Sequence, residues 1–257
     1  MKMLVLWGAI LAFFFQSSAF ARTFEDFKKS GVLKVAVDST YPPMEFENAK
    51  GKVIGFDIDF ANMLAKKLGV KAEFVVMPWD GILAGLAGKR YDVIISSMNV
   101  TKQRQRVVNF VEYVKMGQVF ISKKSGPQVK TINDLNGLVV AVQRDTTSSE
   151  AVEKFQKEVN IKAVKTFVAA TDTFSALKSN QAQVIVIDEP VGSYYAALDK
   201  KTFDVTGQAI SPEPVGIAIR KGDQELFVEI DKAVKKMKKD GSFNRIYKKW
   251  FNRLPHN

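Results

Sequence analysis

Residues 91–104 read Tyr-Asp-Val-Ile-Ile-Ser-Ser-Met-Asn-Val-Thr-Lys-Gln-Arg, an apolar strand followed at once by polar side chains. The strand delivers Ser96, Ser97 and Asn99 to one place, where hydroxyl, amide and backbone groups can form hydrogen bonds. Arg104 follows a turn later, and its planar guanidinium matches a carboxylate with two parallel hydrogen bonds. Such a group can hold a small zwitterion without breaking a bond. The same residues would equally suit a capped strand end beside a surface helix, so both interpretations stay open at this point.

Short apolar strands alternate with helical patterns along the whole chain, which predicts parallel α/β units. Apolar runs predict strands at 32–37, 71–77, 91–95, 119–122, 138–142, 164–168, 184–187 and 216–220. Helical spacing predicts helices at about 57–68, 79–86, 171–177, 225–239 and 242–250. A further helix is expected to begin after Ser149 and to run through Phe155.

Polar side chains follow several of these strands, and in open α/β sheets ligands collect at the carboxyl ends of strands. Asp188 either caps a helix that begins at Glu189 or pairs with an ammonium group. Trp79 and Tyr41 are each either core side chains or ring surfaces for a ligand. Besides Ser96 and Ser97, the polar residues at strand ends are Asp38, Thr146, Thr147 and Asp188.

The N-terminus has the pattern of a secretory signal peptide over residues 1–21. Lys2 precedes an apolar run from Met3 to Phe15, and Ala19-Phe-Ala21 suits the small-residue cleavage rule. The run is too short for a membrane-spanning helix. We therefore expect export, cleavage after Ala21 and a soluble mature chain.

Composition limits the chemistry. The chain has no cysteine, which excludes disulfides, thiolate metal sites and a lipid-bearing cysteine after the signal. We expect the protein to be released into a bacterial periplasm. The only histidine is His256, which argues against serine–histidine catalysis and histidine-rich metal sites. We expect no catalytic residue, no metal and no cofactor.

The formal net charge is +11. Basic charge can indicate nucleic acid or an anionic membrane. We interpret it as solvated helix surface, since lysines recur on helix faces such as 235–239 and no aromatic-interleaved basic repeat is present.

Taken together in this order and spacing, a set of short motifs resembles the periplasmic solute-binding proteins of family 3, the polar amino-acid-binding partners of ABC importers. The resemblance covers essentially the whole mature chain. The motifs are Asp38-Ser-Thr-Tyr-Pro-Pro43, Gly55-Phe-Asp-Ile-Asp59, Trp79-Asp-Gly81, Asp92-Val-Ile-Ile-Ser-Ser97, Thr101-Lys-Gln-Arg104, Asp188-Glu-Pro190, Gly216-Ile-Ala-Ile-Arg-Lys221, Asp240-Gly-Ser-Phe243 and Tyr247-Lys-Lys-Trp-Phe251.

The resemblance implies a type II periplasmic-binding-protein fold, with two α/β lobes joined by two hinge strands and the ligand in the cleft between them. Lobe 1 would comprise residues 22–114 plus 215–257, and lobe 2 residues 119–210. The hinges would fall at about 114–118 and 211–215. Binding would close the lobes by a hinge motion.

The resemblance also implies roles for the two ends of the ligand. Arg104 would bind its α-carboxylate, helped by Asn99 and by Thr147 from the other lobe. Asp188 would bind its α-ammonium together with the Ser97 carbonyl and the Asn99 side chain. The chain departs from the family at two of these positions, because many relatives have Ser or Thr at 99 and glycine is frequent at 147.

The ligand side chain would lie between Tyr41 and Trp79, with Asp38 and Ser96 at its polar tip and Gln143 nearby. A carboxylate at 38 suggests a side chain that ends in a donor: lysine, arginine, histidine or glutamine. The implied function is a monomeric, non-enzymatic receptor that delivers an L-amino acid to an inner-membrane ABC permease, without nucleic acid.

Two alternatives stay open. A few proteins of this fold are periplasmic dehydratases of the prephenate or arogenate type, in which cleft carboxylates act as general acids. The fold also serves as a ligand-sensing module fused to kinases. Because the sequence ends at Asn257 without such a kinase, we expect this alternative less.

Overall fold

The computed structural model describes residues 24–255, so the predicted signal peptide and His256 lie outside the described residues. Within that range the strands form one eight-stranded mixed sheet and one small three-stranded sheet. In sheet order the large sheet contains β5 (Lys71–Val76), β1 (Val32–Val37), β6 (Val93–Ile94), β11 (Phe203–Arg220), β7 (Val108–Lys123), β10 (Val184–Asp188), β8 (Val139–Gln143) and β9 (Ala163–Phe167). The small sheet contains β2 (Thr40–Tyr41), β3 (Glu45–Glu47) and β4 (Val53–Ile54).

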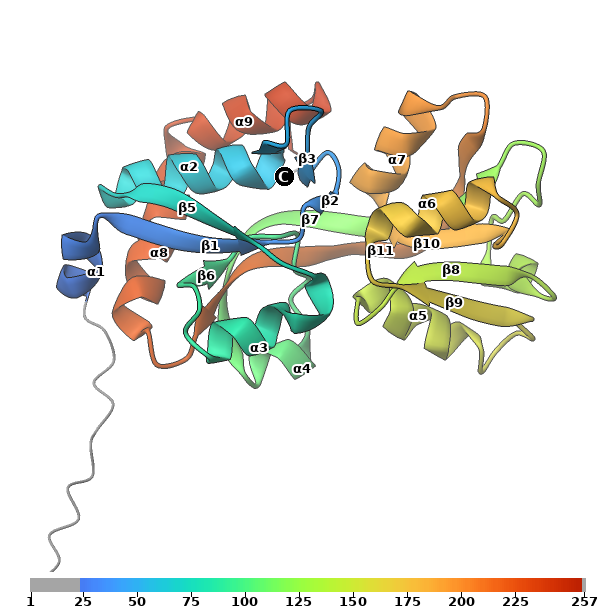
Figure 1. Ribbon diagram of the computed structural model, residues 1–257, viewed down its shortest axis with the longest axis horizontal. Coiled ribbons are helices and arrows are strands. Elements are labelled where there is room, and N and C mark those ends of the chain that lie inside the picture. Colours follow the sequence, from blue (N-terminus) through green and yellow to red (C-terminus); the bar gives the residue numbers. More distant parts are fainter. Residues whose placement is uncertain (1–23, 256–257) are drawn as a thin grey trace, which may run out of the picture.

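The large sheet serves two lobes, which lie at opposite ends of the long antiparallel pair β7 and β11 (Figure 1). The first lobe has β5, β1 and β6 in its sheet, and the second has β10, β8 and β9. Helices of the first lobe are α1 (Phe24–Ser30), α2 (Phe56–Leu68), α3 (Ile82–Ala87), α4 (Lys102–Gln105), α8 (Gln224–Lys239) and α9 (Ser242–Phe251), with the 3-10 turn η1 (Trp79–Gly81). The second lobe has α5 (Thr147–Phe155), α6 (Ala170–Lys178) and α7 (Glu189–Leu198), with the 3-10 turn η2 (Ile132–Leu135).

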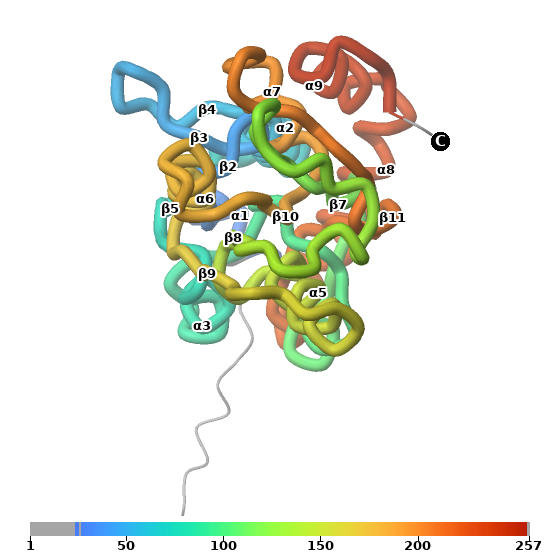
Figure 2. The backbone as a smooth tube through the Cα atoms, turned by 90° about the vertical axis from the view of Figure 1, so that its right-hand side faces the viewer, coloured from blue at the N-terminus to red at the C-terminus, as the bar shows by residue number. Residues whose placement is uncertain are grey.

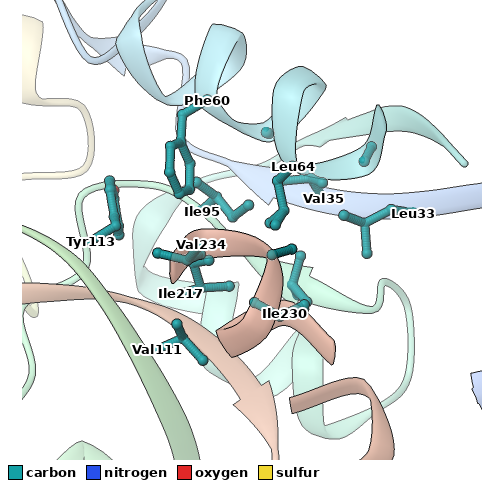
Figure 3. Packing of buried hydrophobic residues seen from close by; sticks show 14 of the residues in the cluster. Leu33, Val35, Phe60, Leu64, Ile95, Val111, Tyr113, Ile217, Ile230 and Val234 are labelled. Carbon is teal, nitrogen blue, oxygen red and sulfur yellow. The ribbon is translucent and has the colours of Figure 1, made fainter. Parts of the chain in front are cut away.

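The core of the first lobe lies between its sheet and helices α2 and α8. Phe60 and Leu64 repeat at helical spacing on the buried face of α2. Figure 3 shows Phe60 beside Ile95, which follows β6 directly, and Leu64 beside Val35 of β1. The helix ends at Gly69, whose φ of 79° is a left-handed conformation that glycine adopts without steric cost. Burial of this apolar stripe is what holds the helix on the sheet.

The core of the second lobe lies on both faces of one sheet, because side chains alternate along a strand. In β10, Ile185 and Ile187 pack with the cluster under α6, whereas Val184 and Val186 pack with the cluster that includes Val152 of α5. The end-on view in Figure 2 shows α5 on one side of β8 and β9 and α7 on the other. This two-sided cover explains why β10 is an uninterrupted apolar run.

The two strands that join the lobes are much longer than the sequence indicated. The runs at 119–122 and 216–220 are only the ends of β7 and β11, which have 16 and 18 residues. Both predicted hinge segments therefore lie inside continuous strands. The β7–β11 register shifts between Ile210 and Glu213 and again between Val215 and Gly216. Such irregularities bend a strand locally, which suits a region where the lobes could move relative to one another.

Smaller differences concern element ends and helices. Helix α1 was not predicted, and α7 was considered only as the helix that Asp188 would cap; Pro190 suits its first turn. The strand predicted at 91–95 shortens to the two residues of β6. Among residues 24–255, none of the helices combines the length and apolar character that crossing a membrane requires.

Candidate binding site

A cavity lies between the lobes, at the carboxyl ends of β1, β6, β8 and β10. Nine of the ten predicted site residues line it; Arg104 is the exception. The empty space at this place, which includes open solvent at its edge, amounts to about 330 Å³. Its lining residues are Asp38, Tyr41, Glu45, Trp79, Ser96, Ser97, Asn99, Gln143, Thr146, Thr147, Ser148 and Asp188.

Asp188 ends β10 and stands at the N-cap position of α7, but its side chain does not cap the helix. Its Oδ2 accepts a hydrogen bond of 2.9 Å from the Tyr41 hydroxyl, whereas Oδ1 has no partner among the described residues. The side chain is 3% exposed. Burial raises the pKa of Asp188 to about 7, although the Tyr41 hydrogen bond and the Arg104 charge act in the opposite direction. Of the two sequence interpretations of Asp188, the geometry favours a partner for a cation.

Arg104 lies beside the cavity on α4, a single turn that the Thr101 side chain caps. Its Nη1 donates to the Asn99 carbonyl at 3.1 Å and its Nη2 to the Asp145 carbonyl at 3.3 Å. The guanidinium lies 5.3 Å from the centre of the Trp79 ring. Burial lowers the pKa of Arg104, against the charges of Glu150 and Asp188. Arg104 was predicted to bind the ligand α-carboxylate, and the structure places it at the border between the cavity and an adjoining groove.

Asp38 and Gln143 face each other across the lobes at the other end of the cavity. Gln143 Nε2 donates to Asp38 Oδ2 at 2.6 Å, while Asp38 Oδ1 accepts from the backbone and hydroxyl of Thr40. The Asp38 backbone N–H donates to Ser96 Oγ at 2.9 Å. Burial raises the pKa of Asp38, and the hydrogen bonds from Gln143 and Thr40 limit the rise.

Ser97 is held in an uncommon backbone conformation, with a φ of 50°. The buried carboxylate of Asp57 accepts hydrogen bonds from the Ser97 N–H at 2.7 Å and the Ser97 hydroxyl at 3.1 Å. Tyr113 of β7 donates to the other oxygen of Asp57 at 2.7 Å. These bonds compensate the strain of the left-handed conformation and fix the polar turn at the end of β6.

Glu45 is a lining residue that sequence analysis missed. It lies on the short strand β3, is 1% exposed, and accepts from the Ser96 hydroxyl at 2.9 Å through Oε1. Burial, followed by the neighbouring Asp57 charge, raises the pKa of Glu45 well above its usual range. No local pattern pointed to Glu45, because only the fold brings β3 against the end of β6. Thr146 and Ser148 also line the cavity, and of these the sequence singled out Thr146 as a polar residue at a strand end.

The lobes are closed on each other around this cavity. Between the lobes, Arg144 forms a 2.7 Å ion pair with Asp80, and Trp79 Nε1 donates to the Asp145 carbonyl at 2.9 Å. Within residues 24–255, groups of three or more acidic or histidine side chains that could hold a metal ion are absent.

Comparison with known proteins identifies the family. A model of the bacterial extracellular solute-binding proteins, family 3, matches residues 33–253. The chain belongs to this family. The L-cystine-binding protein TcyJ of Escherichia coli strain K12 is 35% identical over 231 residues, which cover 87% of this chain and 84% of TcyJ. The glutamine-binding protein GlnH of Bacillus subtilis strain 168 is 32% identical over 212 residues, covering 80% of this chain and 76% of GlnH.

Solved structures agree with the family assignment. A mutant of ArgBP from T. maritima has a TM-score of 0.83 and 34% identity, covering 90% of this chain and 99% of its own. An ancestral arginine-binding protein bound to arginine has a TM-score of 0.83 and 40% identity, covering 86% and 98%. The type II two-lobed fold is thus confirmed. The named relatives are binding proteins, and this family 3 member is a solute-binding protein rather than an enzyme.

Proposed function

We propose that this solute-binding protein is a periplasmic receptor that binds a free L-amino acid between its lobes and delivers it to an ABC permease of the inner membrane. The observation that carries the proposal is the buried carboxylate of Asp188. The residue lines the cavity; one of its oxygens is bonded to Tyr41, and the other has no partner among the described residues. A buried, ionised carboxylate is costly unless a cation meets it, and the α-ammonium of an amino acid is such a cation.

The opposite end of the zwitterion would meet hydrogen-bond donors. Arg104 is next to the cavity, and its Nη1 already bonds the carbonyl of Asn99. The cavity is also lined by Thr147 and Ser148, which occupy the first turn of α5, where backbone N–H groups have no partner within the helix. Donors on one side and Asp188 on the other match the charge separation of an α-amino acid. Arg104 can bind the ligand carboxylate only by turning from the Asp145 carbonyl toward the cavity.

For the ligand side chain we propose a tip that donates hydrogen bonds, as in a basic amino acid or glutamine. The support is chemical: the far end of the cavity contains the carboxyl groups of Asp38 and Glu45. Relatives named for glutamine and arginine are in keeping with this class. Tyr41 and Trp79 would flank the aliphatic part of the side chain.

We further propose that residues 1–21 direct export, that the receptor acts as a monomer, and that residues 114–118 and 211–215 act as hinges. Closure around a ligand would exclude water and strengthen both charge contacts. The lobe boundaries at 22–114 plus 215–257 and at 119–210 follow from the same hinge assignment.

A thermal-shift panel of the twenty amino acids tests the function. The protein is first unfolded and then refolded, which removes any bound ligand. We expect shifts with lysine, arginine, histidine or glutamine, and their loss in Asp188→Asn. The matched control is Asp231→Asn, since Asp231 lies on α8 and pairs only with the exposed Lys235 in the ion-pair network. If none of the twenty shifts the wild type, the proposed function is wrong. Shifts with acidic amino acids alone would contradict the role of Asp38.

A further inference from the structure

Three hydrogen-bonded side chains connect strand β7 with the cavity and cross from one lobe to the other. Gln118 Nε2 donates to Thr147 Oγ1 at 2.8 Å, and the Thr147 hydroxyl donates to Asn99 Oδ1 at 3.1 Å. The three residues are 1%, 8% and 4% exposed. Two atoms of this relay have no partner among the described residues: Gln118 Oε1 at one end and Asn99 Nδ2 at the other.

The direction of the relay follows from the chemistry of a hydroxyl, which carries one hydrogen. Because the Gln118 amide donates to Thr147 Oγ1, the Thr147 hydrogen is available for Asn99 Oδ1. Asn99 therefore accepts with its oxygen, and its NH₂ group is left for the cavity. Gln118 supplies the first donor of this relay, although it is not one of the residues that line the cavity.

The surroundings of Asn99 Nδ2 favour a donor at this place. The Arg104 guanidinium is bonded to the carbonyl of the same Asn99, and the N-terminus of α5 begins at Thr147. A guanidinium and a helix N-terminus both favour a negative charge between them. If the Asn99 amide were reversed, its oxygen would face the negatively charged group held at this place and repel it.

We propose that Gln118 is a positioning residue that keeps the Gln118–Thr147–Asn99 relay in one direction, so that Asn99 presents a hydrogen-bond donor to the carboxylate of the bound ligand. The proposal rests on the proposed function, because it concerns how that site selects an amino acid over analogues without a free carboxylate. The relay also joins the two lobes, since Asn99 belongs to the first and Thr147 to the second. It is therefore complete only in the closed form.

The test compares ligands that differ only at the carboxylate: L-arginine with L-argininamide, and L-glutamine with L-glutaminamide. The carboxamide carries no charge, and its NH₂ group can donate to an oxygen of Asn99. Calorimetry on refolded protein gives the ratio of the two dissociation constants for wild type and for Gln118→Met, which removes the donor and keeps the length. We expect the preference for the free acid to fall about tenfold in Gln118→Met, the size of one hydrogen bond to a charged group.

The matched control is Gln208→Met, because Gln208 is an exposed glutamine on the other long strand and bonds only the nearby Ile210 carbonyl. It should retain the wild-type ratio. A second variant, Asn99→Asp, has oxygens only and should lose the free acid more strongly than the amide. An unchanged ratio of the two dissociation constants in Gln118→Met would overturn the relay. If acid and amide were weakened equally, the role of Gln118 would be structural alone. If the wild type binds neither acid nor any other amino acid, the proposed function itself fails.

Discussion

The hydroxyl of Tyr41 donates a 2.9 Å hydrogen bond to Asp188 Oδ2, although the two residues are 147 positions apart and belong to different lobes. The bond connects the small sheet of the first lobe with the end of β10 in the second. It satisfies one oxygen of a buried carboxylate and leaves Oδ1 without a partner among the described residues. The same hydrogen bond therefore connects the two lobes and leaves the second oxygen of Asp188 available to a cation.

The stability of the ligand-free protein should depend on pH through Asp188. Its folded-state pKa of about 7 exceeds the ordinary 3.8, so the neutral form is favoured on folding. The contribution is fully present below pH 4 and is lost as the pH rises through 7, by at most roughly 4 kcal/mol. We expect Asp188→Asn to remove this loss, so that urea unfolding at pH 8 finds the variant more stable than wild type. A constant difference between pH 4 and pH 8 would contradict the raised pKa.

Removal of the guanidinium next to the cavity should abolish tight binding. Arg104→Ala deletes a charged donor that we propose for the ligand carboxylate, and we expect a loss of roughly 100-fold in affinity for every amino acid bound. Isothermal titration measures it. Arg106→Ala is the control, because Arg106 is an exposed arginine two residues further along. Near wild-type affinity in Arg104→Ala would show that the carboxylate is held elsewhere.

The ion pair between Arg144 and Asp80, which connects the two lobes, should slow ligand release. Arg144 and Asp80 are 2.7 Å apart, in different lobes, with side chains 47% and 31% exposed. Exposed pairs contribute up to about 1 kcal/mol, so Arg144→Ala should speed dissociation by at most about fivefold, and high salt should erase the difference. Stopped-flow release measurements provide the rates. Lys178→Ala removes a pair with Asp199 that stays within the second lobe and should leave the rate unchanged. Identical dissociation rates in wild type, Arg144→Ala and Lys178→Ala would show that the ion pair does not slow ligand release.

Gly55, which joins β4 to α2, should tolerate no side chain. Its φ is 143°, and a Cβ there would lie 2.0 Å from the Met44 carbonyl oxygen. We expect Gly55→Ala to lower the free energy of unfolding by more than roughly 2 kcal/mol. Gly222→Ala is the control, because a Cβ at that position would meet open space. Urea denaturation compares the two, and equal stabilities would contradict the close approach.

Local sequence patterns predicted most of the elements. The apolar runs at 32–37 and 184–187 are strands because a buried strand must cover its side chains on both faces. Helix α8 was predicted from the spacing of its apolar residues, which form its buried stripe. The long strands β7 and β11 were not, since β7 contains Gly117 and β11 contains Pro212 and Pro214 in their middle parts, which are held by pairing with each other. Their continuity depends on a partner about 100 residues away in the chain, which no local pattern records.

The sequence by itself determined which polar residues end the strands, because strand ends are local and parallel strands bring their ends together. Strand ends supplied Asp38, Ser96, Ser97, Asn99, Thr147 and Asp188, while the family resemblance implied Tyr41, Trp79 and Gln143, and these nine line one cavity. Tertiary structure alone decided how these residues act on one another: that Glu45 joins them, that Arg104 stands at the border, and that Gln118 directs the Asn99 amide. The physical reason is that hydrogen-bond direction and the pKa of a buried group depend on neighbours that come from the other lobe.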